Sequence, residues 1–285
     1  MPAKVVPVGR RNSTFQVLQS LRSNRQKRHS TRTFLVEGVL PLTRAIAHGW
    51  TFAALVYPEG ASLSSWARDV RTRANAPTHY ALAPALFEEL SGKDEPSELL
   101  GLVSMADSAI ARIPIRADLF VAIADRPANP GNLGTLIRSC EALGVHGLII
   151  SGHAADGYDP ATISASRGAV FGVPIARIES HTQAADWLAR VRATIGECQI
   201  AGAEEGGGIE ITAFDLTRPT IMVFGNEARG LSHAYQQLCE AAVRIPMVGA
   251  ATSLNVSVAA SIVFFEALRQ RRAAQARSSL PAPGT

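Results

Sequence analysis

Short apolar runs separated by amphipathic stretches predict an α/β protein. In the second half of the chain, helical patterns lie between most of the runs, with apolar positions three and four residues apart. Strands that are apolar at nearly every position are typical of a parallel sheet covered by helices on both faces. The runs predicted to be strands are residues 119–124, 147–151, 173–178, 199–203, 220–224 and 242–246.

A smaller α/β pattern precedes this sheet. TFLVEG and FAALVYP are strand-like, and VLPLTRAIAHG between them is helix-like and ends at Gly49. ALFEEL predicts a further helix and LLGLVSM a further strand, and a linker around Pro114 follows. We divide the chain into a basic arm, a small α/β domain, a larger α/β domain and a disordered tail. Their bounds are residues 1–32, 33–112, 113–275 and 276–285.

Charge is unevenly distributed. Residues 1–32 contain eight Lys and Arg and no acid, and subtracting these eight from the 28 bases of the chain leaves 20 against 24 acids. A cationic block at one end is a candidate polyanion-binding arm, and the alternative is a solvated tail with a short helix around residues 14–23. Too few bulky apolar residues are present for insertion into a bilayer, so RNA or DNA is the favoured partner. The candidate contacts are Arg10, Arg11, Arg25, Lys27 and Arg28.

Several protein classes are disfavoured. No run of about 18 uncharged apolar residues predicts a membrane span, and the first residues lack the apolar stretch of a signal peptide. The three cysteines, Cys140, Cys198 and Cys239, have neither metal-knuckle nor disulfide-framework spacing. We therefore expect a cytoplasmic protein with reduced thiols, no membrane partner and no metal.

The stretch NPGNLGTLIRS, residues 129–139, introduces a helix after the first strand of the larger domain. Asn132 is expected to cap this helix. Arg138 lies about 200° around the helix from Leu136, a member of the apolar stripe, and so points away from the core. At the carboxyl end of a strand, such an arginine is either a ligand contact or an ordinary surface residue.

Two later stretches place polar residues at the ends of other strands. In IMVFGNEARGLS, Asn226 and Glu227 follow a buried strand, and the glycines allow close backbone approach. In RIPMVGAATSLNVSVAASIVFFEAL, a loop leads into a helix for which Ser253 is a candidate N-cap. That helix is apolar on nearly every side, which predicts burial, in part against another subunit.

These stretches occur in the order Asn132-x-Gly134-x-x-x-Arg138, Phe224-Gly225-Asn226-Glu227 with Gly230-Leu231, and Ile245-Pro246-Met247 with Ser253-Leu254-Asn255-Val256-Ser257. Together they resemble the three motifs of the SpoU/TrmH family, the SPOUT-class RNA 2′-O-ribose methyltransferases. TFLVEGVLPLTRAIAHG is similar to the start of that family's L30e-like RNA-binding domain. SRGAVFGVP and the basic arm are similar to its antibiotic-resistance branch, that of avilamycin resistance, which methylates 23S rRNA.

The resemblance implies a SPOUT domain with a C-terminal trefoil knot, one of the exceptions to the rule against threaded chains. It implies a homodimer that transfers a methyl group from S-adenosyl-L-methionine to a ribose, on a uridine of 23S rRNA. Its implied cofactor contacts are Gly225, Asn226, Ile245, Met247, Leu254 and Ala203. Its implied catalytic residues are Arg138, Asn132, Glu227 and Asn255.

Two arginines need separate interpretation. The resemblance puts Arg138 beside the reacting hydroxyl, but guanidinium stays protonated, so we assign it to phosphate binding and alkoxide stabilisation. Arg167 is a candidate RNA contact, or a carboxylate contact across a dimer interface. Two alternative functions stay open: a non-catalytic rRNA-binding or ribosome-assembly protein, and a tRNA 2′-O-methyltransferase. A nucleotide-dependent oxidoreductase is disfavoured because no GxGxxG follows the first strand of either domain.

Overall fold

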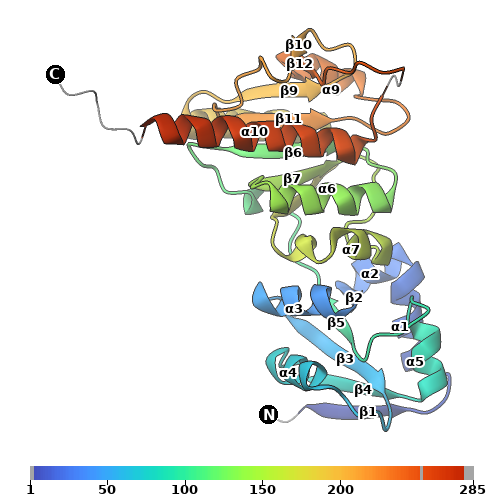
Figure 1. Ribbon diagram of the computed structural model, residues 1–285. Coiled ribbons are helices and arrows are strands. Elements are labelled where there is room, and N and C mark those ends of the chain that lie inside the picture. Colours follow the sequence, from blue (N-terminus) through green and yellow to red (C-terminus); the bar gives the residue numbers. More distant parts are fainter. Residues whose placement is uncertain (1–2, 251–252, 279–285) are drawn as a thin grey trace. The chain divides into compact units, whose positions relative to one another are not determined.

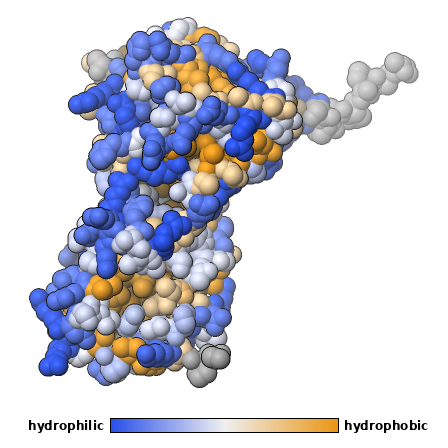
Figure 2. Space-filling view, turned by 180° about the vertical axis from the view of Figure 1, so that it is seen from behind, coloured by the Kyte–Doolittle hydropathy of each residue, from blue (hydrophilic) through white to orange (hydrophobic). Residues whose placement is uncertain are grey.

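The computed structural model describes residues 3–250 and 253–278, and the chain forms two compact units (Figure 1). The first unit extends to Ala106 and includes Asp156–Gly172. The second contains Asp107–Ala155 and continues from Val173. On the face drawn in Figure 2, hydrophilic surface predominates on both units, and each unit also carries apolar patches.

The first unit contains a mixed five-stranded sheet in the order β1-β4-β3-β5-β2. β1, β4 and β3 are parallel, whereas β5 is antiparallel to both β3 and β2. The strands are β1 (Lys4–Val8), β2 (Thr33–Glu37), β3 (Phe52–Pro58), β4 (Thr78–Leu82) and β5 (Leu100–Ser104). The helices are α1 (Ser13–Ser23), α2 (Arg25–Thr31), α3 (Val39–Ala47), α4 (Ser65–Arg73), α5 (Pro84–Leu90) and α7 (Pro160–Ser166).

The N-terminal residues belong to this folded unit, which corrects their interpretation as a separate arm. β1 pairs with β4, and the apolar face of α1 buries Phe15, Leu18 and Leu21. Burial of three large side chains stabilises the segment enough to order it, whatever its charge. The sequence analysis missed β1 because only Val8 of its five residues is buried.

Residues 156–172, which follow β7 in the chain, pack into the first unit. Tyr158 lies against Phe34 with ring centroids 4.6 Å apart, and Trp50 Nε1 donates a hydrogen bond of 3.0 Å to the Phe171 carbonyl. Arg28, only 1% exposed, binds Asp156 at 2.8 Å and Asp159 at 3.1 Å. Apolar packing and a buried ion network therefore hold this segment, which the sequence analysis had assigned to the larger domain.

The second unit contains a seven-stranded sheet in the order β10-β12-β9-β11-β6-β7-β8. Every pairing in it is parallel, which confirms the predicted parallel α/β fold. The strands are β6 (Phe120–Asp125), β7 (Gly147–Ser151), β8 (Ile175–Ile178), β9 (Gln199–Ala203), β10 (Ile209–Glu210), β11 (Thr220–Phe224) and β12 (Ala241–Arg244). The helices are α6 (Pro130–Ala142), α8 (His181–Ile195), α9 (His233–Leu238) and α10 (Val256–Ser278).

Two predicted helix caps are wrong by a few residues. α6 begins at Pro130, and the Asn129 side chain accepts the hydrogen bond from the Asn132 backbone, so Asn129 is the N-cap. α10 begins at Val256, and Asn255 rather than Ser253 accepts from the Ser257 backbone at 2.9 Å. The Asn132 side chain is consequently available for tertiary contacts.

α10 packs along α6, and the Ser261 and Ser139 hydroxyls are 2.7 Å apart. Its buried side comprises Ala260, Val263, Phe264 and Ala267. The prediction of a disordered tail from residue 276 is wrong for residues 276–278, because α10 continues to Ser278; residues 279–285 lie outside the described part. In the described ranges no helix is long and apolar enough to cross a membrane, and no three His, Cys, Asp or Glu side chains are grouped to hold a metal ion.

Candidate functional site

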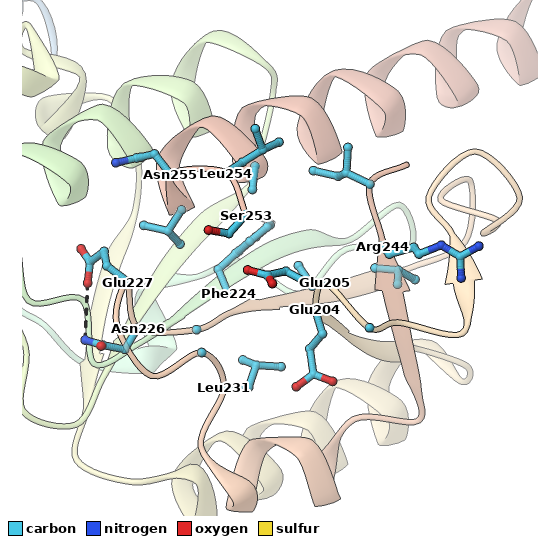
Figure 3. A pocket seen from close by; sticks show the side chains of 18 of the residues that line it. Glu204, Glu205, Phe224, Asn226, Glu227, Leu231, Arg244, Ser253, Leu254 and Asn255 are labelled. Atoms are coloured by element: carbon cyan, nitrogen blue, oxygen red, sulfur yellow. Dashed lines mark hydrogen bonds between the residues drawn. The ribbon is translucent and has the colours of Figure 1, made fainter. Parts of the chain in front are cut away.

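A cavity of about 800 Å³ opens at the carboxyl ends of β9, β11 and β12 (Figure 3). Parallel α/β sheets place ligand sites at this edge, because the loops that follow neighbouring strands meet there. Gln236, Ala259 and Val263 complete the lining. The segments that form most of it are residues 203–206, 224–231, 253–256 and part of 243–247.

The loop after β11 is tightly closed. The backbone groups of Asn226 and Gly230 exchange two hydrogen bonds of 2.9 Å, and Gly230 has a φ of +63°, where glycine is favoured. A Cβ on Gly225 would lie 2.2 Å from the Gly230 carbonyl carbon. Only glycine therefore fits at residue 225 without moving the backbone that lines the cavity.

Contacts with the end of β6 fix this loop. Asn226 Nδ2 donates to the Arg126 carbonyl at 2.8 Å. The buried Asp125 carboxylate accepts from the Ser232 backbone at 2.8 Å and from Arg126 Nε at 2.9 Å. Hydrogen bonds to a charged acceptor are stronger than neutral ones, so the loop has a rigid base.

Three predicted catalytic side chains form one hydrogen-bonded chain at the cavity's edge. Asn255 Nδ2 donates to Asn132 Oδ1 at 3.0 Å, and Asn132 Nδ2 donates to Glu227 Oε1 at 3.1 Å. Glu227 also accepts from the backbone N–H groups of Ala128, at 3.2 Å, and Asn129, at 3.4 Å. Burial raises the pKa of Glu227, but these hydrogen bonds outweigh it, and the net pKa lies below its ordinary value. Glu227 is therefore a carboxylate at neutral pH.

Arg138 and Asn132 do not line the cavity. Arg138 is exposed on α6, six residues after Asn132 and hence roughly 9 Å farther along the helix axis. Its guanidinium has no hydrogen-bond partner among residues 3–250 and 253–278. The structure thus joins Asn132, Glu227 and Asn255 and leaves Arg138 available to a ligand.

All six predicted cofactor contacts line the cavity: Gly225, Asn226, Ile245, Met247, Leu254 and Ala203. The sequence analysis did not identify Glu204 and Glu205, which also line it (Figure 3). Gln236 Nε2 donates to Glu204 at 2.7 Å. The position of Glu204 and Glu205 could have indicated this, because they are two consecutive acids directly after the predicted strand at residues 199–203. The lining also contains Glu227, Arg229 and Arg244. Apolar walls with both acidic and basic side chains suit an organic ligand that has a flat ring and charged groups of both signs.

The predicted RNA contacts all lie in the first unit, and one of them is wrong. Besides its two aspartates, Arg28 donates to the carbonyls of Leu21 and Arg22, so its guanidinium is fully engaged and buried. A buried, paired cation is not available to a phosphate. Arg10 is exposed, Arg11 is mostly exposed although paired with Glu89, and Arg25 and Lys27 are partly exposed; Arg167 is exposed at the end of α7.

Two family models match the chain. The SpoU rRNA Methylase family matches residues 119–265, and the SpoU L30e-like domain matches residues 12–101. A 23S rRNA (uridine(2479)-2′-O)-methyltransferase from Streptomyces viridochromogenes is 43% identical over 262 residues, which is 92% of this chain and 91% of the relative.

Solved structures agree with these matches. The SpoU methyltransferase AviRb from Streptomyces viridochromogenes, in complex with AdoMet, superposes with a TM-score of 0.87 at 43% identity, over 92% of this chain and 99% of that chain. An AdoMet-bound rRNA methyltransferase from Sinorhizobium meliloti superposes with a TM-score of 0.81 at 27% identity, over 93% and 98% of the two chains.

Proposed function

The chain belongs to the SpoU rRNA Methylase family, and from this premise we propose that it is an S-adenosyl-L-methionine-dependent RNA methyltransferase. It methylates the ribose 2′-oxygen of a nucleotide in 23S rRNA, a uridine by analogy with the Streptomyces viridochromogenes enzyme. One observation carries this proposal. The hydrogen-bonded side chains of Asn255, Asn132 and Glu227 lie beside a cavity that is lined by all six predicted cofactor contacts.

The cavity fits the cofactor in size and in chemistry. Ligands of this size occupy pockets of about 300–1,000 Å³, and the apolar Ile245, Leu254 and Met247 suit an adenine ring. Glu204 and Glu205 complement the cofactor's positive charge. When bound, S-adenosyl-L-methionine supplies an activated methyl group.

The protein's own residues orient the nucleotide and stabilise the charge that develops on it. Asn132 and Glu227 present fixed polar atoms that align the ribose. Arg138 binds a phosphate of the substrate and stabilises the negative charge that develops on the 2′-oxygen. Because guanidinium cannot accept a proton at neutral pH, the proton leaves to water or to a phosphate oxygen.

The enzyme acts as a homodimer. Val258, Ile262 and Phe265 form one exposed apolar stripe on α10, with Phe265 58% exposed. Leu254 and Met247, also partly exposed, continue the apolar surface to the cavity, so a second copy covering the stripe would adjoin the site. Phe265→Asp is expected to yield a monomer by sedimentation analysis, and a monomeric wild type would refute the dimer.

The second unit also forms the trefoil knot of the family. After β12, which pairs with β9, the chain returns to pack α10 along α6, and this path supports a threaded C-terminal segment.

An rRNA substrate and three free cysteines support a cytoplasmic location. Methylation of 23S rRNA protects the host ribosome from an antibiotic that binds beside the modified ribose.

Transfer of tritium from labelled S-adenosyl-L-methionine to 23S rRNA tests the reaction. Label is expected on a 2′-O-methyl nucleoside after nuclease digestion, and primer extension at low dNTP concentration locates it. Arg138→Ala is the matched inactive control. Label on a base would refute ribose chemistry, label only in tRNA would assign the chain to tRNA methylation, and rRNA binding without label would favour a non-catalytic protein.

A further inference from the structure

The first unit contains a cavity of its own, of about 650 Å³, that shares no lining residue with the site described above. Residues of β2, the start of α3, the loop after α5 and helix α7 line it. Three basic side chains from three segments line it: Arg22 of α1, Lys93 after α5 and Arg167 after α7.

The acids of this cavity already have protein partners. Glu37 accepts hydrogen bonds from the Ser91 hydroxyl and, at 3.0 Å, from the Gly92 backbone. Asp159 accepts from Arg28 at 3.1 Å and from the Ala161 backbone at 2.9 Å. The donors that each carboxylate needs are therefore supplied within the unit, and neither pairs with the three basic side chains.

The basic side chains keep donors to spare. Within the described ranges the Arg167 guanidinium forms no hydrogen bond or ion pair, and Lys93 Nζ reaches only the Ser97 hydroxyl, at 3.3 Å. Arg22 uses Nη1 for the Leu90 carbonyl at 2.7 Å. Three cations against two carboxylates leave the lining with a net positive charge, and guanidinium and ammonium groups bind a phosphate through charge-assisted hydrogen bonds.

Apolar surface adjoins these cations. Val39 and Leu40, at the start of α3, are 57% and 42% exposed and line the same cavity together with Pro41. These aliphatic side chains give a flat base an apolar surface to cover, and the cations beside them give its phosphate charged donors. An inorganic phosphate would use the cations alone and leave the apolar side chains in water.

We propose that this cavity binds one unstacked nucleotide of the RNA substrate, with the phosphate on Lys93 and Arg167 and the base against Val39 and Leu40. The inference rests on the proposed function, which supplies the RNA. It gives the first unit a defined contact that holds the RNA while a different nucleotide is methylated in the second unit.

The experiment compares binding of in vitro transcribed 23S rRNA to the full-length protein across a salt series. Lys93→Gln, Arg167→Gln and Leu40→Asn are measured against Lys4→Gln. Lys4 is an exposed cation on β1, at the opposite edge of the same sheet from β2, so its replacement removes the same charge away from the cavity. Calorimetry with inorganic phosphate alone is run in parallel.

Lys93→Gln and Arg167→Gln are each expected to raise the Kd for RNA about fivefold and to lower the slope of log K against log salt by about 0.7. Leu40→Asn should weaken binding without changing that slope, because it removes no charge. Lys4→Gln should match wild type within about twofold. Cofactor affinity and kcat at saturating RNA should not change in any of them.

Equal RNA affinity and salt slope in Lys93→Gln, Arg167→Gln and Lys4→Gln would overturn the proposal. So would loss of phosphate binding in Lys93→Gln with RNA binding intact, which would assign the cavity to free phosphate. RNA binding that depends on Lys93 in a protein that transfers no methyl group would refute the proposed function alone. Normal transfer with an unchanged KM for RNA in the variants would refute this inference alone.

Discussion

Asn132 joins Asn255 to Glu227, and the isosteric change Asn132→Asp tests whether that link matters for catalysis. The Asn132 amide nitrogen donates to Glu227 at 3.1 Å, and its oxygen accepts from Asn255 at 3.0 Å. Aspartate keeps the shape and the acceptor but replaces the donor with a second carboxylate oxygen. Two carboxylates then face each other at hydrogen-bonding distance, whereas Asn132→Ala only removes both hydrogen bonds.

Asn132→Asp should lose more activity than Asn132→Ala. Loss of two partly exposed hydrogen bonds costs about 1.5 kcal/mol, which corresponds to about a tenfold fall in kcat if the alignment is lost in the transition state. Two charges about 4 Å apart add about 1–2 kcal/mol of repulsion at a solvent-accessible site. Asn132→Asp keeps the hydrogen bond from Asn255 and loses only the one to Glu227, about half of that 1.5 kcal/mol. Together with the repulsion, its activity should fall about 20- to 100-fold near pH 8.

The pH dependence provides a second signature. The pKa of Glu227 in wild type is lowered, so the network is intact above the ordinary glutamate pKa and weakens only as the pH falls through the folded-state value. In Asn132→Asp the repulsion between the two carboxylates raises the pKa of the pair, so a proton bound as the pH is lowered restores the hydrogen bond. Its activity relative to wild type should thus increase as the pH is lowered.

Single-turnover tritium transfer at saturating RNA and cofactor, from pH 5.5 to 9, measures both effects. Gln237→Glu is the matched control, because it makes the same amide-to-carboxylate change on an exposed position of α9. Activity of Asn132→Asp equal to or above that of Asn132→Ala at pH 8 would refute the reasoning. A relative activity that does not depend on pH would refute the role given to the carboxylate pair.

Three further changes test other parts of the site and fold. Arg138→Ala should lower kcat at least about 100-fold with the Kd for cofactor unchanged by calorimetry, since Arg138 lies outside the cavity lining; weaker cofactor binding would contradict this. Gly225→Ala should raise the cofactor Kd more than about tenfold by forcing residue 230 away, and an unchanged Kd would count against the close approach. Arg28→Met should lower the free energy of unfolding in urea by about 3–5 kcal/mol, because the buried Asp156 carboxylate loses its guanidinium partner and, among the described residues, keeps only His29 Nε2 and the Tyr158 backbone N–H. A loss below about 1 kcal/mol would contradict the buried ion network.

The pattern of apolar runs was sufficient to predict most of the sheet in the second unit. Residues 147–151, 199–203 and 220–224 are strands with the predicted bounds, because buried parallel strands are apolar on both faces and turn-forming residues flank them. β1 and β4 were missed because such a signal is weak in short strands with several exposed or polar positions, as in THYAL. Runs of apolar residues therefore identify the strands that are buried on both faces.

The sequence was sufficient to select residues that line the candidate cavity, but not the hydrogen bonds beside it. The cavity-lining glycines and Asn226 follow predicted strands, and strand ends in a parallel sheet mark the site. The hydrogen bonds from Asn132 to Glu227 and Asn255 span 95 and 123 residues, and no local pattern indicates such a pairing. The helix cap could not be predicted for a similar reason. Asn129 and Asn132 are both good N-cap residues, and the local sequence does not decide between them.

Arg28 shows how tertiary pairing changes the meaning of a basic segment. By sequence it is one of eight cations without a nearby acid, but the chain brings Asp156 to it from 128 residues away. The same segment, residues 156–172, carries Arg167 to the cavity of the first unit. One buried ion network thus removes a cation from the RNA-binding surface and holds the segment that supplies another. Because neither acid of this cavity pairs with Lys93 or Arg167, these two exposed cations keep donors for the phosphate of the proposed nucleotide.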